Sequence, residues 1–150
     1  MAYLAGLLDG EGCVRIGSFY NASNQIRYRA QLAIAMTCKE PLEWASSTFG
    51  GKVYLDKKLK HPDVKECYFW QANSRHGAEI LSQLLSLNLL RVKKRQAEVF
   101  LEFTKTLITR NTTRGRQGAH PISEILLEYR YELFNQMKIL NQKGRKSDFL

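Results

Sequence analysis

The sequence predicts an α+β fold in which helices alternate with two β-hairpins. Apolar and polar residues alternate over residues 13–36 and again over 52–73, and turn sequences interrupt each stretch, which indicates the hairpins. Apolar residues at helical spacing precede, separate and follow these stretches. With 150 residues and a 44% apolar composition, the chain has room for one core. We therefore expect a single domain over 1–150, with 142–150 as a mobile tail.

The first predicted helix covers the stretch LAGLLDGEG, residues 4–12, and has two unlike faces. Its leucines supply an apolar face, whereas Ala2, Gly6 and Gly10 recur every fourth residue and form a narrow smooth stripe. Glycine inside a helix costs roughly 1 kcal/mol relative to alanine. Close packing against another helix would offset that cost, so the stripe of Ala2, Gly6 and Gly10 is the expected dimer interface.

Two acids lie at the end of this helix where the helix dipole is negative. Asp9 and Glu11 fall in the last turn, before Gly12, which we expect to cap the helix. Each misplaced charge costs about 0.3–1 kcal/mol, and a bound divalent cation with oxygen ligands would remove that cost. Two such helices packed side by side would bring their acids together. The alternative is an ordinary amphipathic helix that ends in a solvated turn.

The first predicted hairpin has one polar, basic face. Apolar Val14 and Ile16 share the other face of a strand over 13–20, and the turn sequence NASNQ leads to an alternating strand over 27–36. Long side chains along a strand suit base-edge hydrogen bonds in a major groove, Arg to guanine and Gln to adenine. The alternative is a solvated sheet face. The candidate nucleic-acid-binding residues here are Arg15, Gly17, Phe19, Asn21, Arg27, Arg29, Gln31, Ala33 and Ala35.

A second hairpin is predicted after a short helix. Pro41 suits the first turn of this helix, which should end at about Phe49, before a Gly-Gly pair. Strands over 52–58 and 65–73 follow. The side chains expected to point inward are Val53, Leu55, Tyr68 and Trp70. The outward side chains, which we assign to nucleic-acid binding, are Lys52, Tyr54, Asp56, Lys58, Lys65, Cys67, Phe69 and Gln71.

Three helices are predicted in the C-terminal half. The first is capped by Asn73 or Ser74 and runs to about Leu87, and the second begins near Val92. The third is an amphipathic helix over 121–141 whose apolar stripe we assign to the core.

Basic residues cluster at the start of the second of these helices and in the loop that follows it. Four cations there face a positive helix N-terminus, an unfavourable arrangement that an external anion would relieve: Arg91, Lys93, Lys94 and Arg95. The loop over 109–120 is also basic, and we expect its Arg114 and Arg116 to contact phosphates. Both features favour a polyanionic partner.

The charge of the whole chain points to the same class of partner. The net charge is +9 and the isoelectric point is near 9.6, which is typical of proteins that bind nucleic acid or a membrane surface. Basic charge is segregated, because no acid lies between Glu11 and Glu40. A groove for a polyanion requires such segregation, so nucleic acid is favoured.

Cysteine usage and hydropathy limit the remaining classes. The three cysteines are odd in number and lack CxxC spacing, which indicates neither a zinc site nor a disulfide framework. We therefore expect a reducing intracellular compartment. No apolar run approaches the ~18 residues of a membrane span, and the N-terminus begins directly in the first helix without a signal or transit peptide. We expect no membrane partner and a protein that works where it is made.

The stretch LAGLLDGEG resembles the signature of the LAGLIDADG homing endonucleases. It matches the positions that define the signature and differs at Leu8, Gly10 and Glu11. Because the motif occurs once, the chain resembles the single-motif members, which act as homodimers. The stretch LRVKKRQA, residues 90–97, is similar to a lysine cluster of these members. The resemblance covers residues 1–108, and the last helix is a looser match.

This resemblance implies a fold, an activity and a site. The implied fold is αββαββα, with a curved antiparallel sheet that saddles DNA. The implied activity is site-specific cleavage of both strands of a long pseudo-palindromic DNA site, by an enzyme encoded in a mobile intron of a chloroplast or mitochondrion. Glu11 and a backbone carbonyl near Gly10 would bind Mg²⁺, with Mn²⁺ or Ca²⁺ able to substitute in binding and no small-molecule cofactor. Lys93 would be the catalytic lysine, and Asp9 would be structural.

One position departs from the family pattern. Members often carry a glutamine near the end of the second strand to position solvent, and the matching residue here is Cys38. A thiol is a weak hydrogen-bond partner, so another residue such as Gln71 takes the role, or water is positioned without it, or cleavage is impaired.

Two alternative functions of the same fold are an intron RNA maturase and a catalytically silent DNA-binding protein, but intact Glu11 and Lys93 favour the endonuclease.

Overall fold

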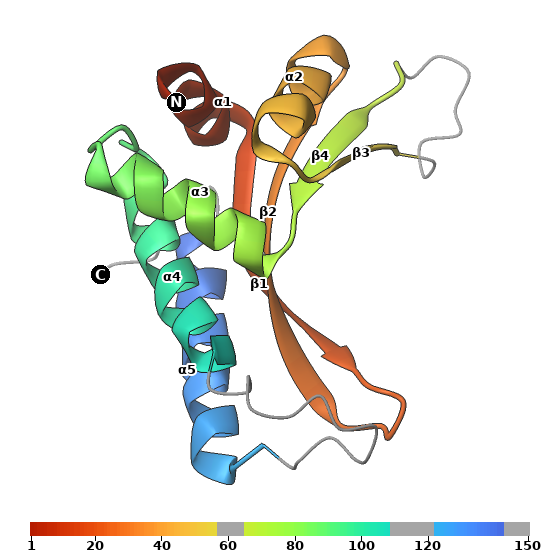
Figure 1. Cartoon of the computed structure of the whole chain (residues 1–150). Helices are drawn as coiled ribbons and strands as arrows, with labels where there is room; N and C mark the ends of the chain where they lie inside the picture. The colour runs from red at the N-terminus through yellow and green to blue at the C-terminus, as the bar shows by residue number, and fades with distance from the viewer. Residues whose placement is uncertain (57–64, 109–121, 143–150) are drawn as a thin grey trace, which may run out of the picture.

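The computed structural model describes residues 1–56, 65–108 and 122–142, and it confirms the α+β prediction (Figure 1). Helices and strands follow in the predicted order of helix, hairpin, helix, hairpin and helices. The elements are α1 (Ala2–Glu11), β1 (Gly12–Tyr20), β2 (Ile26–Met36), α2 (Glu40–Phe49), β3 (Lys52–Leu55), β4 (Tyr68–Ala72), α3 (Ser74–Ser86), α4 (Lys94–Ile108) and α5 (Glu124–Leu140).

The four strands form one antiparallel sheet in the order β1-β2-β4-β3. β1 and β2 are long strands that bend away from the helices (Figure 1). Their turn is closed by the backbone amide of Asn21, which donates to the carbonyl of Gln25 at 3.0 Å, and Asn24 supplies a positive φ of 55°. Asparagine tolerates this conformation, so the turn sequence sets the register of the hairpin.

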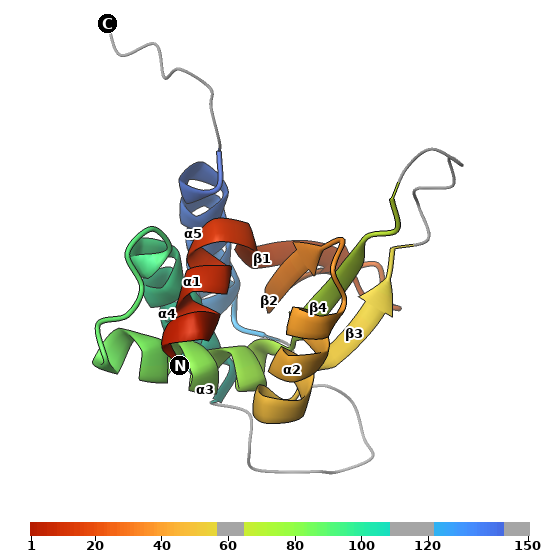
Figure 2. The same ribbon diagram turned by 90° about the horizontal axis from the view of Figure 1, so that it is seen from above.

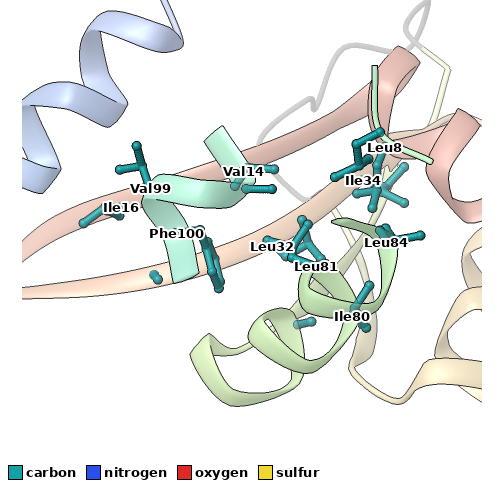
Figure 3. Close-up of a cluster of buried hydrophobic side chains, with 14 of the residues drawn as sticks. Leu8, Val14, Ile16, Leu32, Ile34, Ile80, Leu81, Leu84, Val99 and Phe100 are labelled. Carbon is teal, nitrogen blue, oxygen red and sulfur yellow. The ribbon is translucent and has the colours of Figure 1, made fainter. Parts of the chain in front are cut away.

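The helices gather on one side of the sheet (Figures 1 and 2), and this side holds the core. Every second residue is buried from Gly12 to Ile16 on β1 and from Tyr28 to Ile34 on β2, as alternation requires. Helix α3 and helix α4 meet the same side with their own apolar stripes. Figure 3 shows the resulting cluster, which includes Leu8, Val14, Ile16, Leu32, Ile34, Ile80, Leu81, Leu84, Val99 and Phe100. Each such side chain contributes about 1.5–3 kcal/mol when fully buried.

Glycines follow the ends of α1 and α2, but in different backbone conformations. Gly50 and Gly51 have φ values of 78° and 86°, a conformation that favours glycine, and they stop α2 as predicted. Gly12 is the C-cap of α1, as expected, and its backbone N–H donates to the carbonyl of Leu8. Its φ of −77° and ψ of 152° are extended, however, and it begins β1. Glycine is needed there for space, because a Cβ would lie 2.4 Å from the carbonyl oxygen of Leu8.

The second hairpin is shorter than the sequence pattern suggested. β3 ends at Leu55 and β4 begins at Tyr68, so the prediction of strands reaching 58 and starting at 65 was wrong. Leu55 lies opposite Tyr68 and on the same side as Val53 and Trp70, as expected, but its side chain is 40% exposed at the end of the edge strand β3. A single backbone hydrogen bond, from Asp56 to the carbonyl of Cys67, continues the pairing at 2.8 Å.

The predicted helices are present with small shifts at their ends. Asn73 caps α3, since its side chain accepts from the backbone amide of His76, and Ser123 caps α5 in the same manner. Helix α5 starts at Glu124 rather than Pro121, and the predicted basic loop and the tail beyond 142 lie outside the described residues. None of the helices in the described ranges is long and apolar enough to cross a membrane.

Candidate nucleic-acid interface and active site

The register of the sheet gathers the predicted outward residues on one face. In an antiparallel pair, residues that are directly opposite project to the same side. Arg15 lies opposite Gln31, Ala33 opposite Gln71, and Gln71 in turn opposite Lys52. The whole face, which we call the outer face, is made of Cys13, Arg15, Gly17, Phe19, Arg27, Arg29, Gln31, Ala33, Ala35, Phe69, Gln71, Lys52 and Tyr54.

The outer face is uncovered and positively charged. Its members are exposed or half-buried, whereas the residues between them are buried from Val14 to Ile16 on β1 and from Tyr28 to Ile34 on β2. Neither β1 nor β2 contains an acid. Eight of the glutamates in the described residues lie instead on helices α2 to α5: Glu40, Glu43, Glu79, Glu98, Glu102, Glu124, Glu128 and Glu132. The segregation of charge seen in the sequence is therefore a segregation between the two sides of the molecule.

Three arginines of the outer face are each held by a different neighbour. The Nε and Nη2 groups of Arg15 donate to Oε1 of Gln31 at 3.1 and 2.8 Å. The guanidinium of Arg29 lies 5.5 Å from the centre of the Phe19 ring, a cation–π contact. Arg27 turns back toward the hairpin turn, where it donates to the side chain of Gln25 at 2.6 Å and to a backbone carbonyl at 2.9 Å. These contacts limit the conformations that the side chains can adopt.

Not all predicted interface residues are equally placed to bind a ligand. Asn21 uses its side-chain oxygen to accept from the amides of Ser23 and Gln25 at 3.1 and 2.9 Å, so it closes the turn. Lys65 is exposed but lies before β4 rather than in it. The predicted residues Lys58, Arg114 and Arg116 lie outside the described residues.

At the β3 end of the outer face, aromatic and polar groups surround a hollow. Tyr54 and Phe69 stack with ring centres 5.2 Å apart. Beside them is a hollow of about 270 Å³ lined by Gly51, Lys52, Tyr54, Gln71, Asn73 and His76. The sequence pattern did not identify His76 as a candidate site residue. It lies in the first turn of α3, and only the tertiary fold brings it next to Lys52 and Tyr54 of β3.

The predicted metal-binding acid lies at the junction between α1 and the outer face. Glu11 is exposed, and it lines a hollow of about 320 Å³ together with Ala35, Met36, Thr37, Cys38 and Cys67. Cys38, at the position where the resemblance implies a solvent-positioning glutamine, therefore lies beside Glu11, whereas Gln71 does not line this hollow. Lys39 is the next residue in the chain after Cys38. Its ammonium is hydrogen-bonded to the carboxylate of Glu43, which raises the pKa of Lys39.

Asp9 joins the end of α1 to the start of α4. Its carboxylate accepts hydrogen bonds from the backbone amides of Arg91, Val92 and Lys93 at 2.8, 3.1 and 2.9 Å. Free amides at a helix start attract an anion. An external anion was expected from the sequence at the cationic segment 91–95, and the structure shows that the carboxylate of Asp9 binds the amides there. The expected structural role of Asp9 is consistent with these contacts.

These three hydrogen bonds hold Lys93 beside helix α1, which carries Glu11. Lys93 is only 6% exposed, so its hydrocarbon stem is packed inside the protein. In the described part of the chain, no fully buried side-chain nitrogen or oxygen lacks a hydrogen-bond partner. The hydrogen bonds that involve Lys93 use its backbone, so its ammonium reaches the surface at the end of a buried stem, as long side chains often do.

The oxygen donors near Glu11 fit a hard divalent ion whose other ligands are water and substrate phosphates. Among the described residues, no three His, Cys, Asp or Glu side chains are grouped to hold a metal ion. One chain offers the exposed Glu11 carboxylate and the carbonyl of Gly10, which the end of α1 leaves without a partner amide in the helix. Mg²⁺ is commonly bound by one or two carboxylates, water and substrate phosphates, so this donor set suits it.

The stripe of Ala2, Gly6 and Gly10 is exposed and open. In the residues that the structure describes, a Cβ added at Gly6 or Gly10 would meet no heavy atom within 4 Å. The glycines are therefore not required by packing within the chain. Next to this stripe, the exposed Tyr3 meets Trp44 of α2 edge to face, with ring centres 4.9 Å apart, a contact that the sequence pattern did not reveal.

Arg130 was also missed by the sequence pattern, which placed only apolar residues on the inner side of α5. It is 4% exposed, and it donates to the hydroxyl and the carbonyl of Thr106 at 3.0 and 2.7 Å. Its guanidinium thereby binds the C-terminal end of α4, where carbonyls lack helical partners. This site holds two helices together and lies away from Glu11.

Comparisons with known proteins identify the fold. No family model and no curated protein matches the sequence. Solved structures do match. The homing endonuclease I-CvuI in complex with its target has a TM-score of 0.72 and 19% identity over 96% of this chain and 83% of that one. The archaeal intron-encoded homing endonuclease I-Vdi141I complexed with DNA has a TM-score of 0.73 and 18% identity over 97% and 86%.

A third similar structure spans a longer protein. The LAGLIDADG homing endonuclease I-GzeII in complex with a DNA target has a TM-score of 0.67 and 17% identity over 89% of this chain but 43% of that one. At these identities the likeness establishes the fold. The chain has the α+β fold with a curved antiparallel sheet that these endonucleases share, as the resemblance of the first helix implied.

Proposed function

We propose that the chain is a site-specific DNA endonuclease of the LAGLIDADG homing type, dependent on a divalent metal and active as a homodimer. The observation that carries the proposal is the position of Glu11, an exposed carboxylate at the junction of the α1 stripe and the basic outer face. By likeness to the intron-encoded I-Vdi141I, the proposal extends to a gene carried by a mobile intron.

The outer face supports duplex DNA as the ligand. Successive outward residues on a strand are about 6.6–6.8 Å apart, which is close to twice the 3.4 Å rise per base pair. A strand laid along a major groove would thus offer one side chain for about every second base pair. The residues available for this on β1 and β2 include Arg15, Arg29 and Gln31, and no acid on these strands repels the phosphates.

The open stripe on α1 supports a two-fold dimer. A symmetric dimer uses the same surface on both copies, and helix α1 offers a face without side chains at Gly6 and Gly10. Packing there would place Glu11 of each copy near the same axis. Two copies then supply one acid for each DNA strand, and a two-fold protein would bind a pseudo-palindromic site.

The chemistry proposed for the site divides among four residues. Glu11 and the carbonyl of Gly10 would hold a divalent ion such as Mg²⁺. When bound, such an ion holds the scissile phosphate and lowers the pKa of the attacking water. The ammonium of Lys93 would stabilise negative charge on the phosphate as the bond breaks. Asp9 holds the backbone of Lys93 and so fixes its position relative to Glu11.

The proposal is tested in two steps, selection and cleavage. Duplexes bound by the wild type are first selected from a randomised library, and the enriched duplex is then incubated with enzyme and Mg²⁺. Glu11→Gln should lower the single-turnover rate about 10³-fold, since the loss of metal binding removes several kcal/mol from the transition state, while specific DNA binding is kept. The matched control is Glu128→Gln, an exposed acid on α5, which should cut at the wild-type rate.

The other outcomes identify the alternatives. Wild-type binding to one duplex without cleavage in Mg²⁺, Mn²⁺ or any other divalent ion would indicate a silent DNA-binding protein. Selection of a structured RNA in place of a duplex would indicate a maturase. Cleavage by Glu11→Gln at the wild-type rate would remove Glu11 from the site.

A further inference from the structure

Arg15 and Gln31 form one hydrogen-bonded unit at the centre of the outer face. They are direct partners across β1 and β2, and a single oxygen, Oε1 of Gln31, accepts from both Nε and Nη2 of Arg15. Two N–H groups on one edge of the guanidinium are thereby occupied. The plane of the guanidinium is fixed by a residue on the neighbouring strand.

The donors that remain on Arg15 match one base. An arginine has five N–H donors in a planar fork, and the bonds to Gln31 occupy the edge formed by Nε and Nη2. The opposite edge, formed by Nη1 and Nη2, still offers two parallel donors. Two parallel donors bind the O6 and N7 acceptors of guanine, the commonest specific contact in the major groove.

The acceptor on Gln31 is used in the same contact. A glutamine that binds adenine must both accept from N6 and donate to N7. Oε1 of Gln31 has two lone pairs, and both are engaged by Arg15. Gln31 therefore lacks the free acceptor that adenine requires, contrary to the simple pairing of glutamine with adenine expected from the sequence.

We infer that Arg15 and Gln31 bind a single guanine together, with Arg15 in contact with the base and Gln31 as a positioning residue. The inference rests on the proposed DNA-binding function and adds one specified base to the target. Fixing the guanidinium before binding lowers the entropy lost when the base is bound. The geometry also assigns no adenine to Gln31.

The neighbouring arginines show what is particular to this pair. Arg29 lies two residues from Gln31 on the same face, but it contacts the Phe19 ring rather than an amide. Arg27 directs its guanidinium into the hairpin turn, toward Gln25. Arg29 is therefore the matched control. It lies on β2 and on the outer face, as Gln31 does, but the position of its guanidinium does not depend on Gln31.

The test measures base preference position by position. Wild-type protein first selects duplexes from a randomised library in Ca²⁺, and Arg15→Met and Arg29→Met then identify the base pair that each arginine contacts. Arg15→Met should lower the preference for guanine at its base pair by about 5- to 150-fold, the range for one bidentate contact. Gln31→Ala should lower the preference at that same base pair by about 2- to 10-fold, the range for a lost hydrogen bond.

Two further measurements separate positioning from a general loss of structure. Gln31→Ala should leave the preference at the Arg29 base pair unchanged. Gln31→Glu keeps an acceptor for both N–H groups of Arg15, so it should retain the preference for guanine even though its charge weakens binding to every duplex. Because the ratio of affinities between bases is compared, this uniform loss cancels.

Three results would overturn the inference. Gln31→Ala could remove a preference for adenine at a different base pair, or leave the Arg15 base pair unchanged, or Arg15→Met could leave every guanine preference intact. In each case the enriched wild-type motif would still support the proposed function. A wild-type protein that enriches no motif refutes the proposed function, and the inference falls with it.

Discussion

Replacement of Asp9 should destabilise the protein by an amount that can be worked out from its contacts. Asp9→Ala removes the acceptor of three backbone amides at the start of α4. Loss of a capping side chain costs about 0.5–2 kcal/mol, and the charge and the three bonds place Asp9 at the upper end. Removal of an acid from the negative end of α1 returns about 0.3–1 kcal/mol. The expected net loss is about 1–1.5 kcal/mol.

The assay is urea unfolding followed by far-ultraviolet circular dichroism, with thermal unfolding as a second measurement. The urea midpoint should fall without a change in slope, and Tm should fall by about 2–6 °C for a chain of this size. Asp9→Asn keeps one acceptor oxygen and should lie between wild type and Asp9→Ala. Glu11→Gln is the matched control, since it is two residues away, and it should not lower the midpoint.

The reasoning would be refuted by an Asp9→Ala protein with the wild-type urea midpoint. Such a result would mean that water replaces the carboxylate at the three amides without loss. A fall of equal size in Glu11→Gln would instead show that any acid at this end of α1 stabilises the fold, and the specific contact with α4 would not be the cause.

Three other perturbations test the site and the core. Gly6→Leu should block close approach at the α1 stripe, so sedimentation should show a dimer for wild type and a monomer for the variant; a dimeric, active variant would place the interface elsewhere. Lys93→Met should slow single-turnover cleavage and leave binding unchanged, whereas Arg91→Met should weaken binding and lower its salt slope by about one unit; the reverse pattern would assign Lys93 to the backbone contacts. Arg130→Met should lower the free energy of unfolding by about 1–3 kcal/mol, because two hydrogen bonds from the buried guanidinium to Thr106 are lost; an unchanged Tm would contradict this.

Local patterns were sufficient to predict the elements and the faces of the strands. Alternation along β1 and β2 assigned Arg15 and Arg29 to the outer face, and the observed register agrees. The turn sequence and the Gly-Gly pair predicted where chain segments end, because the required backbone conformations are local. The position of Asp9 at the wrong end of a helix was also visible in the sequence as an anomaly.

The rest depended on contacts between distant residues. The partner of Asp9 lies 82 to 84 positions away, at Arg91 to Lys93, and no local pattern indicates which amides it binds. The predicted lengths of β3 and β4 were wrong, because β3 is an edge strand that ends at Leu55 and β4 begins at Tyr68, where its pairing with both β2 and β3 starts. The burial of Arg130 was missed because helical periodicity treats every charge as solvated, although a charge can bind the exposed carbonyls of another helix.

The division of the sheet into a packed face and an uncovered face also affects how such a protein can change during evolution. Residues such as Lys52 and Ala35 are exposed and do not belong to the core. Surface substitutions away from specific contacts usually change stability by no more than about 0.5 kcal/mol. If the chain binds DNA as proposed, the lineage could therefore change its target site at such positions one at a time while the fold remained stable. Directed evolution of new targets could use the same positions, but Arg15 and Gln31 would have to be randomised together.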